Sequence, residues 1–226
     1  MASRCLLYYI TDRTQFGGDE HARRQALLKK IAEATRAGVD YIQLRERDLS
    51  TRDLERLAVE ALRATRSERP GNAEGQTATR LLINSRSDIA LASEADGVHL
   101  RSGDVSPADI HEVWNMYGVR SLSRENRPIV AVSCHTASDV LVAESRGADL
   151  SVFAPVFEKK NAPGVKPQGL SALREACQSR LPVLALGGVT LDSAKSCLDA
   201  GAAGIAAIRL FQENKIEEVV RTLRAL

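Results

Sequence analysis

Short apolar runs alternate with amphipathic segments eight times along this chain. The apolar runs are rich in Leu, Ile, Val and Ala, as expected of strands that are covered on both faces. Parallel strands need crossover connections, and helices between the runs would supply them. The runs are Leu6–Ile10, Val39–Leu44, Leu81–Ile83, Gly97–Leu100, Ile129–Val132, Leu150–Phe153, Pro182–Leu186 and Gly204–Ile208.

The segments between these runs have the spacing of amphipathic helices. Leu54, Leu57 and Ala61, for example, fall on one helical stripe. The step from helix to strand recurs as a similar phrase, such as Ala-Gly-Val-Asp at 37–40 and Gly-Ala-Asp at 147–149, which indicates one repeated unit. The predicted helices are His21–Ala37, Thr51–Thr65, Ala137–Gly147, Leu170–Arg180, Asp192–Gly201 and Lys215–Leu226.

These repeated units predict a single α/β domain over residues 1–226, folded as a closed (β/α)8 TIM barrel. Two polar stretches, near 67–79 and 117–127, interrupt the rhythm, and we expect both to be surface insertions. The alternative is an open doubly wound sheet. That fold would place a glycine-rich phosphate loop after the first strand, where Thr11-Asp12-Arg13 stands instead.

Composition and charge favour an enzyme or binding protein for small molecules. Lys and Arg number 31 against 29 Asp and Glu, so we expect no nucleic-acid-binding face. No apolar run approaches about 18 residues, which predicts a cytoplasmic protein without a membrane partner. A homo-oligomer is left open. The four cysteines lack zinc-site spacing, and we expect free thiols at Cys5, Cys134, Cys177 and Cys197.

Polar and cationic residues gather where the predicted strands end, the face that carries the active site in such barrels. A cationic mouth on a nearly neutral chain predicts a small anionic ligand, although salt bridges to Glu46, Asp104 or Glu158 are the alternative use of its arginines. Lys159, Lys160 and Lys166 follow the sixth strand. The candidate substrate-binding residues are Gln43, Arg45, Arg47, Asn84, His99, Ser133, Gly187, Gly188 and Arg209.

Two features of this mouth suggest specific chemistry. Gly187-Gly188 follows the seventh strand, where barrels often bind phosphate on backbone amides, although a tight turn would also explain the pair. His135 follows the fifth strand and is the candidate catalytic residue, because histidine exchanges protons near neutral pH. A structural hydrogen bond is the alternative role for His135 and for His99.

Several short motifs resemble the thiamine phosphate synthase/TenI family over nearly the whole chain, from Leu6 to about Phe211. The resemblance implies a (β/α)8 barrel that binds a small thiazole phosphate in thiamine biosynthesis. The matching motifs are Tyr9–Asp12, Gln43–Arg47, Ile83–Ala90, Gly97–Leu100, Ser133–His135 and Ala185–Gly188.

That family has two branches, and the resemblance here is mixed. Its synthases join hydroxymethylpyrimidine pyrophosphate to thiazole phosphate with Mg²⁺, whereas its thiazole tautomerases aromatise thiazole carboxylate phosphate without metal. Ser85 stands where the synthases carry one magnesium-binding Asp, and Asp104 matches the second carboxylate. Ser133-Cys134-His135 resembles the tautomerase motif, in which the histidine is the acid/base.

We therefore expect a thiazole tautomerase that works by a proton shift at His135 and needs no cofactor. The first alternative is a thiamine phosphate synthase, which would use Mg²⁺ at Asp104. The second alternative is a non-catalytic sensor of a phosphorylated ligand. Turnover with Mg²⁺, or binding without turnover, would distinguish these alternatives.

Overall fold

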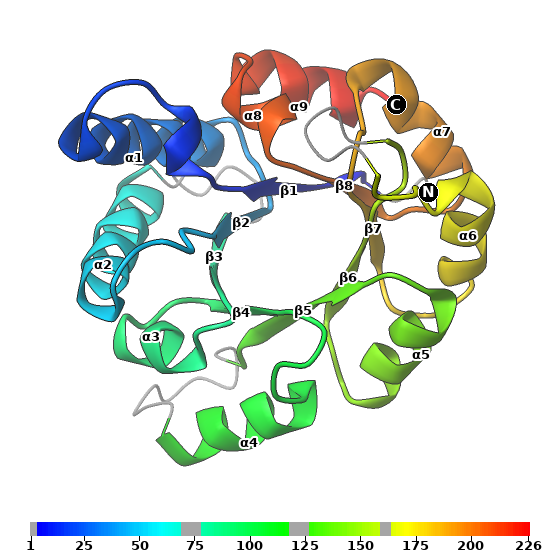
Figure 1. Cartoon of the computed structure of the whole chain (residues 1–226), viewed down its shortest axis with the longest axis horizontal. Helices are drawn as coiled ribbons and strands as arrows, with labels where there is room; N and C mark the ends of the chain where they lie inside the picture. The colour runs from blue at the N-terminus through cyan, green and yellow to red at the C-terminus, as the bar shows by residue number, and fades with distance from the viewer. Residues whose placement is uncertain (1–3, 69–77, 118–126, 159–163) are drawn as a thin grey trace.

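A computed structural model describes residues 4–68, 78–117, 127–158 and 164–226. Its strands pair in parallel in sequence order, and the last pairs with the first, so the (β/α)8 barrel expected from the sequence is confirmed. Figure 1 shows the ring of strands with the helices outside it. The strands are β1 (Leu6–Ile10), β2 (Tyr41–Leu44), β3 (Arg80–Asn84), β4 (Gly97–Leu100), β5 (Ile129–Cys134), β6 (Leu150–Phe153), β7 (Val183–Ala185) and β8 (Gly204–Ala207).

The helices agree with the predicted segments and add three more, α3, α4 and α8. Of these, α3 and α8 have six and four residues, too few to show a helical period in the sequence. The helices are α1 (Glu20–Arg36), α2 (Thr51–Ser67), α3 (Ser87–Ala92), α4 (Pro107–Tyr117), α5 (Ala137–Ser145), α6 (Gly169–Ala176), α7 (Leu191–Asp199), α8 (Arg209–Gln212) and α9 (Ile216–Arg224).

Apolar side chains fill both faces of the barrel wall, because successive side chains of a strand point to opposite faces. In β1, Tyr8 and Ile10 belong to the inner cluster, whereas Leu7 and Tyr9 pack in the outer layer. Both strand faces are therefore buried, which explains why the strands read as continuous apolar runs in the sequence.

Aspartates at three helix-to-strand steps bind back to the start of the preceding strand. Each carboxylate accepts the backbone N–H of the second residue of that strand, which fixes the register between neighbouring strands. Asp40 also accepts a hydrogen bond from Nη2 of Arg224, in the last helix, at 2.8 Å. The three bonds are Leu7 N to Asp40 Oδ2 at 2.7 Å, Leu81 N to Asp96 Oδ2 at 2.8 Å and Val130 N to Asp149 Oδ2 at 2.8 Å.

The polar insertions predicted near 67–79 and 117–127 lie mostly outside the described residues. Their near edges are seen, because Ser67 ends α2 and Tyr117 ends α4. No helix within the described ranges is long and apolar enough to cross a membrane. The expectation of free thiols is confirmed for all four cysteines.

Candidate functional site

A cavity of about 730 Å³ lies where the strands end, inside the ring. Every residue predicted for substrate binding or catalysis lines it, so the structure brings together residues from distant parts of the chain, from Gln43 to Arg209. The predicted residues on its wall are Gln43, Arg45, Arg47, Asn84, His99, Ser133, His135, Gly187, Gly188 and Arg209.

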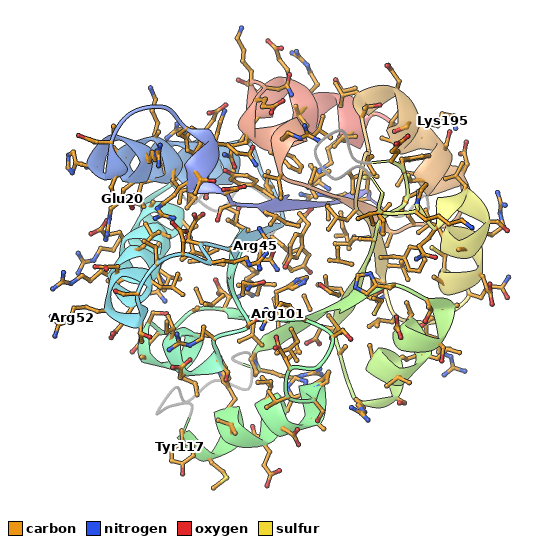
Figure 2. All side chains as sticks on the ribbon, in the orientation of Figure 1. Glu20, Arg45, Arg52, Arg101, Tyr117 and Lys195 are labelled. Carbon is orange, nitrogen blue, oxygen red and sulfur yellow. The ribbon has the colours of Figure 1, made fainter. Side chains whose placement is uncertain are left out.

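Arginines give one side of this cavity its positive charge. In Figure 2, Arg45 lies inside the ring of strands and Arg101 beside the β4–β5 side of that ring, whereas Arg52 lies at the periphery. Neither Arg45 nor Arg47 forms an ion pair within the described ranges, and burial together with the charge of Arg47 lowers the pKa of Arg45. The salt-bridge alternative thus fails for these two arginines, which remain available to an anion.

Arg101 is a cavity residue that the sequence analysis missed. It follows β4 two positions after His99, and its Nη2 lies 3.2 Å from Oδ1 of Asp104. Its position directly after a predicted strand is the feature of the sequence that could have identified it. The predicted Arg209 begins α8 on the other side of the cavity mouth. Of the lysines predicted after the sixth strand, Lys159 and Lys160 lie outside the described residues, and Lys166 does not line the cavity.

The Gly187-Gly188 pair has both the conformation and the close contacts that require glycine at its second position. Gly187 and Gly188 have φ values of +98° and +67°. A Cβ on Gly188 would lie 2.5 Å from the carbonyl oxygen of Glu158 and 2.8 Å from Cβ of Phe157. Neither glycine N–H donates a hydrogen bond to any residue that the structure describes. The geometry of the turn is thus enough to explain the glycine. The turn also leaves two backbone N–H groups that can donate hydrogen bonds to an anion.

His99 is a buried, neutral side chain that supports a neighbour. Its Nδ1 lies 2.8 Å from the Tyr8 hydroxyl, and its Nε2 lies 2.8 Å from Oγ of Ser133. Burial, reinforced by the charge of Arg45, lowers the pKa of His99 to about 3. Tyr8 could not be identified as its partner from the sequence, because a tyrosine inside an apolar run looks like a core residue. The arrangement fixes the Ser133 hydroxyl on the cavity wall.

His135 has one ring nitrogen fixed by the backbone. Its Nδ1 lies 2.7 Å from the carbonyl oxygen of Ala154. A carbonyl only accepts, so the hydrogen sits on Nδ1, and Nε2 of the neutral ring is an acceptor. The backbone N–H of His135 donates at 2.8 Å to Asp139, the residue that forms the capping box of α5 with Thr136. A rigid helix start thus places a proton acceptor beside the cavity.

The donors near Asp104 do not fit a magnesium site. Asp104 is bound to Arg101, and hydrogen bonds from Arg101 and Ser85 outweigh its burial and lower its pKa. Mg²⁺ prefers several charged or carbonyl oxygens, and Ser85 is neutral. No group of three or more His, Cys, Asp or Glu side chains that could hold a metal occurs among the described residues. We therefore derive no step through a metal.

Comparison with known proteins gives consistent results. A family model described as thiamine monophosphate synthase matches residues 7–211. "Putative thiamine-phosphate synthase 2" of Aquifex aeolicus is 37% identical over 92% of this chain and 97% of its own length. The thiamine-phosphate synthase of Chlorobium luteolum is 34% identical over 88% of this chain and 86% of its own. The structure of thiamine phosphate pyrophosphorylase from Pyrococcus furiosus aligns with a TM-score of 0.74 and 26% identity, covering 97% of this chain and 94% of that one.

These relatives correct one expectation from the sequence. The prediction of a thiazole tautomerase is wrong, because the relatives at 31–38% identity carry synthase names. The prediction relied on Ser85 and on the motif Ser133-Cys134-His135. That motif places a proton acceptor at the cavity, but an acceptor serves many reactions and does not specify a proton shift. Similarity over the whole chain is the stronger indicator.

Proposed function

This chain belongs to the thiamine monophosphate synthase family, and we propose that it joins hydroxymethylpyrimidine pyrophosphate to thiazole phosphate, releasing pyrophosphate. One observation carries this proposal beyond the family. The cavity offers anion-binding groups on two sides, with Arg45 and Arg47 after β2 and the Gly187-Gly188 amides after β7. Around the ring, β7 is three strands away from β2, which precedes Arg45 and Arg47. It is also three strands away from β4, which precedes Arg101. Two phosphorylated substrates can thus be held at separate places.

The reaction assigned here exchanges one bond for another. The bond between the pyrimidine methylene carbon and the diphosphate oxygen breaks, and its electron pair leaves with the diphosphate. The lone pair of the thiazole nitrogen forms the new carbon–nitrogen bond. Negative charge grows on the departing diphosphate, so fixed cations beside it lower the barrier. Arg45, Arg47 and Arg101 are the side chains we assign to that role.

The remaining polar groups orient the two rings. We assign Nε2 of His135 as the hydrogen-bond acceptor for the amino group of the pyrimidine. The pyrimidine loses electron density as the diphosphate leaves. The Ser133 hydroxyl, held by His99, and the Asn84 amide offer further hydrogen bonds on the cavity wall. Because the donors around Asp104 do not fit Mg²⁺, the arginines supply the positive charge in this proposal.

A coupling assay on the full chain tests the proposal. The purified protein is incubated with both substrates, and thiamine phosphate and pyrophosphate are measured as products. We expect Arg45→Ala and Arg47→Ala each to lower kcat/KM about 10- to 100-fold, as expected for losing a hydrogen bond to a charged group. Arg52→Ala is the control, because Arg52 lies at the barrel periphery (Figure 2).

The outcomes separate the candidate functions. Equal amounts of the two products, formed by the wild type and reduced in the arginine variants, support the synthase. Binding of thiazole phosphate without any coupling would overturn the proposal and favour the ligand sensor. Coupling that is unaffected by both arginine substitutions would overturn the role given to these arginines.

A further inference from the structure

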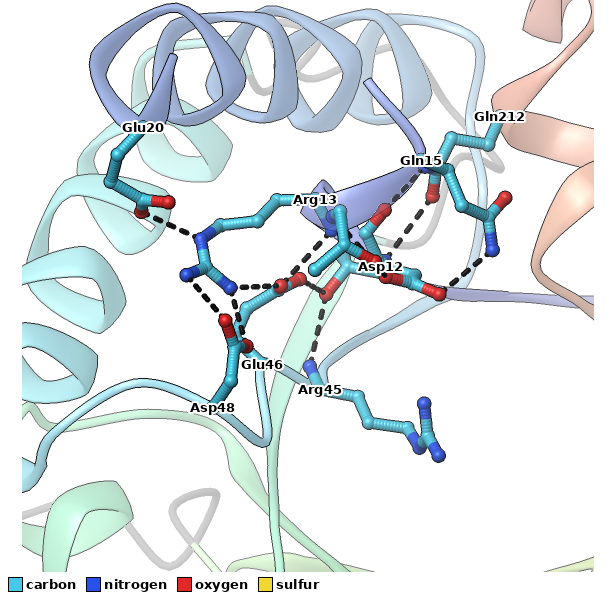
Figure 3. Close-up of polar contacts among 10 residues, drawn as sticks. Asp12, Arg13, Gln15, Glu20, Arg45, Glu46, Asp48 and Gln212 are labelled. Carbon is cyan, nitrogen blue, oxygen red and sulfur yellow. Dashed lines mark hydrogen bonds and ion pairs between the residues drawn. The ribbon is translucent and has the colours of Figure 1, made fainter. Parts of the chain in front are cut away.

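Glu46 stands between the two cavity arginines in sequence, yet its carboxylate points away from the Arg45 guanidinium (Figure 3). Its Oε1 accepts a hydrogen bond from the Thr11 hydroxyl at 2.6 Å. Its Oε2 accepts from the backbone N–H of Arg13 at 3.0 Å and from Nη1 of Arg13 at 3.2 Å. An ionised carboxylate, which only accepts, can take all three of these donors. Glu46 is thus fastened into the barrel wall at the end of β1.

Thr11 connects this buried carboxylate to the arginine segment. Its hydroxyl hydrogen goes to Glu46, and its oxygen accepts the backbone N–H of Arg45 at 2.9 Å. Thr11 is itself fully buried, and its N–H donates to the carbonyl of Gln43 at 3.0 Å. One side chain therefore fixes two successive residues after β2. In Figure 3 the Arg45 guanidinium extends away from this cluster.

Arg13 balances the charge of Glu46 and is held in turn by two outer carboxylates. Its guanidinium donates to both oxygens of Asp48, at 2.7 and 2.9 Å, and to Glu20 at 2.7 Å. Hydrogen bonds to Asp48 first, and then to Glu20 and Glu46, outweigh burial and raise the pKa of Arg13. Arg13 is 3% exposed, so its charge is committed to this cluster rather than to the cavity.

Together these contacts determine which charges face the cavity. Burial raises the pKa of Glu46, while hydrogen bonds from Thr11 and Arg13 oppose that shift. A buried carboxylate needs such partners, because an unpaired charge is costly away from water. Glu46 already interacts with the charge of Arg45. Asp12 acts on Arg45 in the same sense, and a Glu46 carboxylate released from the wall would add a second negative charge beside that arginine.

We propose that Thr11 and Arg13 are positioning residues, which hold Glu46 in the wall so that Arg45 and Arg47 keep their charges free for the diphosphate group of a substrate. The identity of that substrate rests on the proposed function. The binding role itself requires only a diphosphate, so inorganic pyrophosphate is a sufficient probe. Loss of the Thr11 hydroxyl should therefore weaken pyrophosphate binding without touching the glycine side of the cavity.

The experiment measures the Kd of inorganic pyrophosphate and of thiazole phosphate by calorimetry on the full chain. We expect Thr11→Val to weaken pyrophosphate binding about tenfold, as one hydrogen bond in a charged network would. Thr11→Ser should restore it, because the hydroxyl returns. Glu20→Gln is the matched control: it removes a carboxylate from Arg13 but none of the contacts to residues 45–47, and should bind pyrophosphate as the wild type does.

Each outcome decides the question. Selective loss of pyrophosphate affinity in Thr11→Val, with rescue in Thr11→Ser, supports the proposal. Unchanged affinity in Thr11→Val overturns it, and so does a wild type that does not bind pyrophosphate. Parallel loss of both ligands together with a lower unfolding temperature would show general damage, which also overturns it. A wild type that binds pyrophosphate but couples nothing would overturn the proposed function and leave the positioning role standing.

Discussion

The phenol oxygen of Tyr8 lies 2.8 Å from Nδ1 of His99, at the centre of the barrel. With Ser133 at its other nitrogen, the imidazole is enclosed by two hydroxyl groups and is 3% exposed. Its pKa of about 3, against an ordinary value of 6.5, keeps the ring neutral where an exposed histidine would take up a proton. His99 is therefore a fixed part of the scaffold rather than a proton donor.

This depressed pKa predicts how stability depends on pH. Between pH 6.5 and about 3 the unfolded chain binds a proton at His99 that the folded protein does not, so the free energy of unfolding falls as pH falls. The His99 contribution between pH 7 and 5 is about 2 kcal/mol. Urea unfolding of the wild type and His99→Gln at several pH values measures it, and the variant should have the shallower slope. Parallel slopes would contradict the assignment.

His135→Asn tests the proton acceptor at the cavity. The asparagine amide can still donate to the carbonyl of Ala154, but no atom replaces Nε2. We expect the coupling rate to fall about 10²-fold, while the affinities for pyrophosphate and thiazole phosphate change less than about tenfold. His111→Asn is a matched control, because His111 contacts the carbonyl of Gly147 at 3.0 Å outside the cavity. Near-wild-type turnover of His135→Asn would remove the histidine from the chemical step.

A pair of glycine substitutions separates phosphate binding from backbone strain. Gly188→Ala and Gly201→Ala both place a Cβ at positive φ, +67° and +101°, with close contacts at 2.5 and 3.0 Å. Both should lower stability by about 1–3 kcal/mol. Only Gly188→Ala should also weaken thiazole phosphate binding, by about tenfold or more, because Gly201 lies away from the cavity. Thermal unfolding and calorimetry together check this, and equal loss of binding in both variants would refute the phosphate assignment.

Ser85→Asp tests the magnesium question. Ser85 has a φ of +59°, a conformation in which Asp is better tolerated than most residues, so the fold should accept the change. We expect EDTA to leave wild-type coupling unchanged, since the arginines carry the charge. The variant should gain stimulation by Mg²⁺, because a second carboxylate then stands beside Asp104. Rates measured over a Mg²⁺ titration decide between these cases, and strong EDTA inhibition of the wild type would count against the metal-free proposal.

The sequence predicted the barrel and most of the polar cavity residues because both depend on local patterns. Apolar periodicity identifies each strand, and parallel topology then brings every strand end to one face. The bounds moved by only a few residues; β5, for example, continues two residues beyond its apolar run, to Cys134. Residues such as Arg45 and His135 could therefore be assigned to the cavity from their positions alone.

Local patterns could not predict which side chains contact one another in the folded protein. Arg13 and Glu46 are 33 positions apart, and nothing local shows that Arg13 would be buried against Glu46 rather than left in solvent. The same limit applies to the reaction. Motifs around Ser85 and His135 favoured the tautomerase, but the bond that breaks depends on how cations and acceptors surround the substrate, and this arrangement is a property of the folded cavity.

The aspartates at the helix-to-strand steps bear on how such a ring is assembled. Asp40, Asp96 and Asp149 each accept a hydrogen bond from the strand just before them in the sequence. Each of these bonds can form once the connection that follows the strand has been synthesised. Arg224, near the end of the chain, then donates a hydrogen bond to Asp40, the first of these aspartates. The barrel is therefore closed by contacts at the end opposite the cavity, so substitutions in the loops that line the cavity leave these contacts in place.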